Sequence, residues 1–227
     1  MDSIVLASNN SEKCKEITKL LGNCINKLYL QSELNISSIE ETGSSFIENA
    51  ILKARHASKY AKLPAIGDDS GLMIDALGGK PGLYSARFAG INATYKQNIE
   101  QVLAMLANTT NRTARYYCVI ALVSSADDPM PKIFDGVLDG EILIAPISGG
   151  GFGYDPIFYL PSKKCAVSEL EIEQKNSLSH RGIAINKLKQ WLASSIFDYA
   201  KAMSDKTVHR CTSCDGVIPI RKNDRLF

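Results

Sequence analysis

The sequence predicts an α/β fold with a mixed central sheet flanked by helices. Near the N-terminus, the apolar run 3–7 is followed by a segment of helical periodicity, as in the strand-turn-helix units of parallel sheets. In the middle of the chain, residues 115–124 are rich in aromatic and β-branched residues, and residues 132–138 read as a returning strand. Parallel strands at the start and antiparallel strands later indicate a mixed sheet.

The composition is that of one globular domain. The chain has 227 residues, 45% of them hydrophobic, which is enough to bury a sizeable core. Lys plus Arg exceed Asp plus Glu by only two, 26 against 24, so the sequence predicts neither nucleic acid nor a membrane surface as a partner. The first apolar run is too short for a signal peptide, and no run approaches the length of a membrane span. Six scattered cysteines fit reduced thiols, and we expect a cytoplasmic protein.

The turn after the first strand has the residues of a phosphate site. The polar run 8–11 leads into a helix that begins at Glu12, with Lys13 in its first turn. Such a turn aims free backbone N–H groups and the positive end of the helix dipole at a ligand, which favours phosphate. The spacing is not that of a P-loop. A capped helix with a surface lysine is the simpler interpretation of this segment alone.

A pair of adjacent carboxylates lies before the next predicted helix. Glu40 and Glu41 precede a capping box at 45–48, and the apolar stripe along 46–61 predicts a helix. Lys53 lies on a neighbouring face of this helix, where it either points into a cleft or sits in water.

Two adjacent carboxylates follow the apolar run 63–66. Asp68 and Asp69, with Ser70 after them, indicate a buried strand whose C-terminal edge presents acids to a cleft. Adjacent carboxylates are costly to ionise together. The pair therefore indicates either bound Mg²⁺ or one carboxylate with a raised pKa that acts as a general base. A polar turn after a strand is the alternative.

Later segments carry features that suit a flat, oxygen-rich ligand. The glycine-rich segment 149–156 lets the backbone approach a ligand closely, and its Phe152 and Tyr154 offer faces for stacking on a base. His180 and Arg181 begin the last long helix, where they supply donors to carbonyl or phosphate oxygens.

With these segments in hand, the sequence resembles the inosine/xanthosine triphosphate pyrophosphatase family, also called the Ham1-like proteins. The resemblance extends in family order to about Trp191. The matching segments are 5–10 with Lys13, 40–55, 68–72, 76–87, 151–158, and Lys175 with 179–182. The resemblance implies an elongated α/β fold with a long mixed sheet, two lobes with a substrate cleft between them, and a homodimer.

The resemblance also implies a reaction. It is the hydrolysis of ITP, dITP or XTP to the nucleoside monophosphate and pyrophosphate, by metal-assisted attack of water on the α-phosphate. It implies Mg²⁺ as the cofactor, Glu40 and Asp69 as metal ligands, and Asp69 as the general base, with Glu41 and Asp68 as alternatives within each pair. The implied substrate-binding residues are Ser8, Asn9, Asn10, Ser11, Glu12, Lys13, Lys53, Ser70, Phe152, Gly153, Tyr154, Asp155, Lys175, His180 and Arg181.

Base selection is the second task that the resemblance implies. Hypoxanthine and xanthine carry a 6-oxo acceptor where adenine carries an amino donor, so fixed donors at that edge reject adenine. His180 and Arg181, with Lys175 beside them, are the natural donors, and Phe152 would stack on the base. Two other interpretations stay open: a Maf-like pyrophosphatase acting on pyrimidine or modified nucleotides, and a non-catalytic nucleotide- or RNA-binding module.

The C-terminal segment departs from the family pattern. We expect residues 1–203 to form the pyrophosphatase domain and residues 204–227 to form an extension beyond the family's usual end. Cys211 and Cys214 faintly resemble half of a zinc ribbon, but a second pair of ligands is absent. The sequence therefore favours a mobile or dimer-packing tail over a metal site.

Overall fold

The structure, a computed structural model, describes residues 3–204. The chain divides into two compact units, residues 1–190 and 191–227. All the candidate site residues lie in the first unit. Cys211 and Cys214 lie outside the described residues, and the predicted boundary at residue 203 stays a prediction.

A single mixed sheet organises the described residues, in the order β2-β1-β3-β4-β5-β6-β7. β1 is parallel to β2 and β3, and the remaining neighbours are antiparallel. This confirms the predicted mixed sheet. The strands are β1 Ser3–Ala7, β2 Lys27–Leu30, β3 Ala65–Ile74, β4 Thr113–Val123, β5 Lys132–Ile142, β6 Phe158–Leu160 and β7 Cys165–Ala166.

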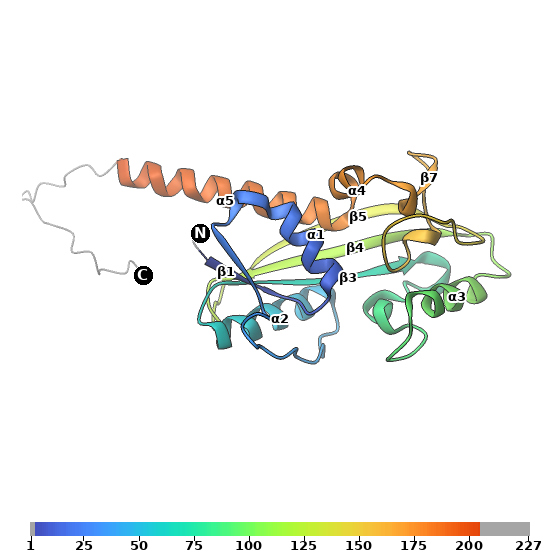
Figure 1. Cartoon of the computed structure of the whole chain (residues 1–227), viewed down its shortest axis with the longest axis horizontal. Helices are drawn as coiled ribbons and strands as arrows, with labels where there is room; N and C mark the ends of the chain where they lie inside the picture. Colours follow the sequence, from blue (N-terminus) through green and yellow to red (C-terminus); the bar gives the residue numbers. More distant parts are fainter. Residues whose placement is uncertain (1–2, 205–227) are drawn as a thin grey trace, which may run out of the picture. The chain divides into compact units, whose positions relative to one another are not determined.

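Helices flank the sheet, and α1 and α2 lie on opposite faces of it (Figure 1). This placement follows from the strand order, because the two crossovers from β1 to β2 and from β2 to β3 proceed in opposite directions along the sheet. Among the described residues, no helix combines the length and the hydropathy that a membrane span requires. The helices are α1 Ser11–Leu21, α2 Phe46–Ala61, α3 Tyr95–Met105, α4 Ile172–Leu178 and α5 His180–Ser204.

The packing of α2 against the sheet is unusually close. Ala50, Ala54 and Ala57 on the buried side of the helix have no exposed surface. A Cβ atom at Gly67 of β3 would overlap the carbonyl oxygen of Ala50. Small residues on the helix and glycine on the strand therefore bring the α2 backbone close to β3, which brings Lys53 to the carboxylates of that strand.

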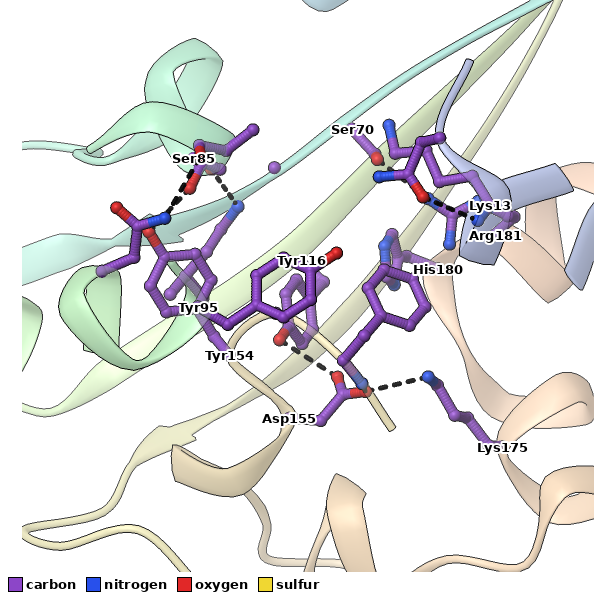
Figure 2. A pocket seen from close by; sticks show the side chains of 17 residues that line it. Lys13, Ser70, Ser85, Tyr95, Tyr116, Tyr154, Asp155, Lys175, His180 and Arg181 are labelled. Atoms are coloured by element: carbon purple, nitrogen blue, oxygen red, sulfur yellow. Dashed lines mark hydrogen bonds and ion pairs between the residues drawn. The ribbon is translucent and has the colours of Figure 1, made fainter. Parts of the chain in front are cut away.

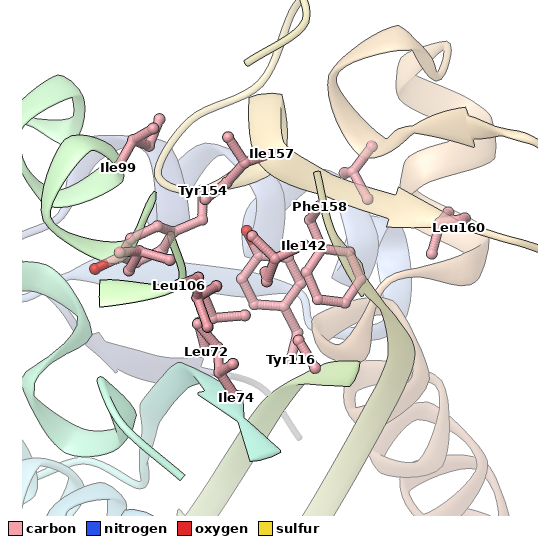
Figure 3. Close-up of a cluster of buried hydrophobic side chains, with 13 residues drawn as sticks. Leu72, Ile74, Ile99, Leu106, Tyr116, Ile142, Tyr154, Ile157, Phe158 and Leu160 are labelled. Carbon is pink, nitrogen blue, oxygen red and sulfur yellow. The ribbon is translucent and has the colours of Figure 1, made fainter. Parts of the chain in front are cut away.

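A hydrophobic core lies where β3 and β4 meet α3 and the segment around β6 (Figure 3). Tyr116 and Phe158 stack in it with ring centroids 4.4 Å apart. Burial of this many apolar side chains is the main stabilising contribution that the fold offers. The cluster consists of Leu72, Ile74, Ile99, Val102, Leu106, Ala114, Tyr116, Ile142, Tyr154, Ile157, Phe158, Leu160 and Val167.

The prediction that a strand ends at Asp68 and Asp69 is wrong, because β3 continues to Ile74. The last pair between β1 and β3 joins Ala7 to Gly67, whereas the pairing with β4 continues through Ile74. The acids therefore stand in the middle of a strand, just beyond the end of its parallel neighbour. Because side chains alternate along a strand, Asp68 and Asp69 point to opposite faces of the sheet.

Candidate active site

Asp68 lies in a buried cluster of charges on the face that carries α1 and the start of α5. Its side chain is inaccessible and accepts from Lys13 Nζ at 2.6 Å, Arg181 Nε at 3.0 Å and Cys118 Sγ at 3.2 Å. Burial alone would raise the pKa of Asp68, but the charges of Arg181 and Lys13 outweigh burial and lower it. Asp68 is therefore a permanent carboxylate whose oxygens are already bonded.

Asp69 lies on the opposite face, and its environment is different. Lys53 Nζ contacts its Oδ1 at 2.9 Å, while its buried Oδ2 has no hydrogen-bond partner among the described residues. Burial raises the pKa of Asp69, and the nearby Lys53 offsets this only in part. A buried carboxylate with a raised pKa and one available oxygen suits a general base or a metal ligand.

Lys53 joins Asp69 to the carboxylate pair that precedes α2. Its ammonium also contacts Glu41 Oε1 at 2.7 Å, and Arg87 lies 3.4 Å from the other oxygen of Glu41. Burial would lower the pKa of Lys53, but the charges of Asp69 and Glu41 outweigh burial and raise it. Glu40, the predicted metal ligand, is exposed. Glu41 is thus the member of its pair that shares a cation with Asp69.

The turn before α1 only partly matches its prediction. Asn10 caps the helix, because the backbone N–H groups of Glu12 and Lys13 donate to its Oδ1 at 3.0 and 3.1 Å. Those two donors are therefore not free for phosphate, contrary to the expectation from sequence. Lys13 points to Asp68, and Glu12 forms an ion pair with Lys15 at 2.9 Å.

Most of these groups line one polar pocket. We call it the phosphate pocket, after the ligand group expected there. Arg87 lines it as well, although no role was predicted for that residue. Ser11, Glu12 and Asp69 are not among its lining residues, although Lys53, which contacts Asp69, is one of them. Of the predicted residues, those that line the phosphate pocket are Ser8, Asn9, Asn10, Lys13, Glu40, Glu41, Lys53 and Asp68.

A second, more apolar pocket, here the base pocket, lies beside the first and contains the predicted residues from the later part of the chain (Figure 2). Asn10, Lys13 and Ala86 line both pockets, so the two adjoin. A ligand with a flat ring at one end and several anionic groups at the other can span them. The predicted residues that line the base pocket are Ser70, Phe152, Gly153, Tyr154, Asp155, Lys175, His180 and Arg181.

His180 is fixed at the floor of the base pocket. Its ring stacks on Tyr116 with centroids 4.7 Å apart and an interplanar angle of 11°. A Cβ atom at Gly136 of β5 would overlap the His180 carbonyl oxygen, so glycine there lets the start of α5 lie against the sheet. Burial, with Arg181 nearby, lowers the pKa of His180 well below its usual value, so the imidazole is neutral at neutral pH. Its Nδ1 is buried without a partner among the described residues.

A chain of ion pairs connects this pocket to Asp68. Lys175 contacts Asp155 at 2.8 Å and Glu16 at 2.9 Å, and Glu16 contacts Arg181 at 2.6 Å. Burial would lower the pKa of Lys175, but Asp155 and Glu16 outweigh it and raise that pKa. Arg181 uses three of its five N–H groups on Asp68, Glu16 and Ser70, which leaves two for a ligand.

No role was predicted for three residues that contact the predicted site residues: Glu16, Arg87 and Tyr116. Glu16 follows Lys13 by one helical turn, so the i,i+3 spacing on α1 was an available signal. Arg87 lies within a segment that carried the family resemblance. The sequence around Tyr116 is that of an ordinary buried strand and does not indicate a role for it. The structure shows that its hydroxyl donates to Asp155 at 3.2 Å.

Comparisons with known proteins identify the family. The Ham1 family profile matches residues 4–191. A dITP/XTP pyrophosphatase of Coxiella burnetii is 49% identical over 197 residues, covering 86% of this chain and 98% of that protein. A solved HAM1 protein structure from Coxiella burnetii, 49% identical, has a TM-score of 0.80 and covers 86% of this chain and 100% of that one. The Staphylococcus aureus Ham1 protein structure is 42% identical with a TM-score of 0.78, with coverage of 86% and 100%. These matches confirm the resemblance seen in the sequence, and the chain belongs to the Ham1 family.

Proposed function

We propose that the protein hydrolyses ITP, dITP and XTP to the nucleoside monophosphate and pyrophosphate. The observation that supports this most directly is the adjacency of the two pockets, which share Asn10, Lys13 and Ala86. One pocket has the aromatic and apolar lining that suits a base, and the other has the lysines and carboxylates that suit a triphosphate with a cation. The similarity to proteins named dITP/XTP pyrophosphatase supports the choice of substrate.

The carboxylates fit Mg²⁺ as the cofactor. Among the described residues no group of three or more metal-ligating side chains occurs, but Mg²⁺ commonly takes only one or two protein carboxylates together with substrate phosphates and water. Asp69 offers a buried oxygen without a partner, and Glu41 shares Lys53 with it. A cation bound there would neutralise charge that develops on the phosphate oxygens.

The protein's own residues account for the remaining steps. Asp69, with its raised pKa, accepts a proton from the water that attacks the α-phosphorus. Lys13 and Lys53 contact carboxylates 2.6 to 2.9 Å away in this structure, and both line the phosphate pocket where they can turn to phosphate oxygens. Lys13 and Lys53 would then offset the negative charge of the leaving pyrophosphate.

Base selection rests on the floor of the base pocket. Neutral His180 has one ring N–H to donate, and Arg181 retains two N–H groups after its protein contacts. A 6-oxo oxygen accepts from such donors, whereas the amino group of adenine would leave them unpaired.

The metal assignment yields a test within the adjacent pair Glu40 and Glu41. We expect Glu41→Gln to raise the Mg²⁺ concentration for half-maximal activity by about 10-fold or more, because it loses a charged ligand. We expect Glu40→Gln to change it less than about twofold, because Glu40 is exposed. Titrating Mg²⁺ while pyrophosphate release is followed measures both effects. The reverse order of effects would assign the metal site to Glu40, as the family resemblance implies.

A substrate panel tests the proposed function itself. Pyrophosphate release should be followed with ITP, dITP, XTP, GTP, ATP, dTTP and UTP at fixed Mg²⁺. We expect kcat/KM for ITP and XTP to exceed that for ATP by at least about 100-fold, because ATP leaves buried donors unpaired. A preference for dTTP or UTP would favour the Maf-like alternative, and nucleotide binding without turnover would favour a binding module.

We also retain two predictions that rest on the sequence and the resemblance: a homodimer, and a cytoplasmic location. Sedimentation of the purified chain checks the first.

A further inference from the structure

Four tyrosine and phenylalanine side chains line the base pocket, and two of them are immobilised. The Tyr116 ring stacks between His180 and Phe158. Tyr154 is 4% exposed and its hydroxyl donates to the carbonyl oxygen of Ser85 at 2.8 Å. Neither ring can turn to follow a ligand. The other two rings belong to Phe152 and Tyr95.

Phe152 forms a fixed wall of the pocket. Its backbone N–H donates to Asp155 Oδ2 at 2.9 Å. The ammonium of Lys175 lies 4.5 Å from the centroid of its ring, and that ammonium is itself held by Asp155 and Glu16. The cation over the ring restricts its orientation.

Tyr95 combines an anchored backbone with a partly exposed side chain. It is the first residue of α3, whose cap Thr94 is held by Gln97 in a capping box. Asn98 fixes the same end of the helix by bonding to the backbone of Ala86 and Ala89. Tyr95 remains 45% exposed.

The spacing of the two rings suits an inserted base. The centroids of Tyr95 and Phe152 are 6.2 Å apart and the rings are inclined by 42°, so they form an open wedge rather than a stacked pair. A flat ring between two parallel rings needs about 7 Å, twice the carbon contact distance of about 3.5 Å. A rotation of the exposed Tyr95 side chain that opens the wedge by about 1 Å therefore suffices. Figure 2 shows Tyr95 beside Tyr154 and Ser85, on the side of the pocket opposite Lys175.

We propose that Tyr95 binds the substrate's base by stacking on the face opposite Phe152. This role rests on the proposed function, because it requires a purine nucleotide in the pocket. Stacking depends on the π-face that every purine has, so Tyr95 contributes affinity, whereas His180 and Arg181 contribute selection.

The test compares Tyr95→Ala and Tyr95→Phe with Tyr60→Ala, a control at a tyrosine that is 62% exposed on α2 and lines neither pocket. Calorimetry with the non-hydrolysable α,β-methylene analogue of ITP and Mg²⁺ gives Kd, and steady-state assays give kcat and KM for ITP and GTP. We expect Tyr95→Ala to raise Kd and KM for ITP about 10-fold, with kcat within about threefold and the ratio of ITP to GTP preference unchanged. Tyr95→Phe and Tyr60→Ala should stay within about twofold of the wild type.

Three results would overturn this role while the wild type still turns over ITP. They are an unchanged Kd in Tyr95→Ala, a loss confined to kcat, and an equal loss in Tyr95→Phe, which would assign the effect to the hydroxyl rather than the ring. A wild-type protein that neither binds the analogue nor hydrolyses ITP would instead overturn the proposed function, and the role of Tyr95 with it.

Discussion

Asp69→Asn is expected to lower kcat for ITP hydrolysis by about 10²- to 10⁴-fold, the usual contribution of a general base. Asn keeps the shape of the side chain but cannot accept the proton from the attacking water. Because Asp69→Asn also removes one charge from the proposed Mg²⁺ site, both measurements use saturating Mg²⁺. The lysines and the base pocket are unchanged, so the affinity for the non-hydrolysable ITP analogue should then stay within about tenfold of the wild type. Steady-state assays of pyrophosphate release measure kcat, and calorimetry measures the affinity for the analogue.

Asp139→Asn provides the control, because Asp139 is a carboxylate whose side chain is 79% exposed on β5. It should retain wild-type kcat. Undiminished turnover in Asp69→Asn would remove the general base from the mechanism, and would favour a site in which another group activates the water.

Asp68→Asn is expected to lower the free energy of unfolding more than Asp69→Asn does. Asp68 is the inaccessible carboxylate between Lys13 and Arg181, and removing its charge leaves Arg181, which is 2% exposed, with only part of its compensation. Breaking a buried ion pair costs roughly 3–5 kcal/mol in free energy of unfolding. Urea unfolding should show this as a lower midpoint with an unchanged slope.

The matched control is Asp135→Asn. Asp135 forms an ion pair with Lys187 at 2.7 Å, but the two side chains are 45% and 51% exposed. Exposed pairs contribute about 0–1 kcal/mol, so this variant should unfold close to the wild type. Equal small losses in the two variants would show that the cluster around Asp68 does not hold α1 and α5 to the sheet.

The different surroundings of Asp68 and Asp69 show what the sequence could and could not predict. Two adjacent carboxylates after an apolar run predicted a site, and the structure brings cations from α1, α2 and α5 to them. The sequence could not predict which cations each acid contacts. That depends on the strand register: β3 pairs with β1 only as far as Gly67 but with β4 through Ile74. That register places Asp68 among cations from α1 and α5, and Asp69 beside Lys53 of α2.

Local patterns predicted helix α2 well, but contacts between residues far apart in the sequence could not be predicted. The capping box and apolar stripe predicted α2, which runs from Phe46 to Ala61. The contacts of Glu16 with Lys175 and Arg181 join residues more than 150 positions apart, so spacing in the sequence could suggest Glu16 but not its partners. The same holds for the stacking of His180 on Tyr116.

The central claim is that water attacks the α-phosphorus of a purine triphosphate beside Asp69. Hydrolysis of ITP with Mg²⁺ in water enriched in the heavy oxygen isotope, followed by phosphorus NMR of the products, tests it most directly. The account predicts IMP that carries the heavy oxygen and pyrophosphate that does not. Heavy oxygen in pyrophosphate, or release of orthophosphate and IDP, would contradict it.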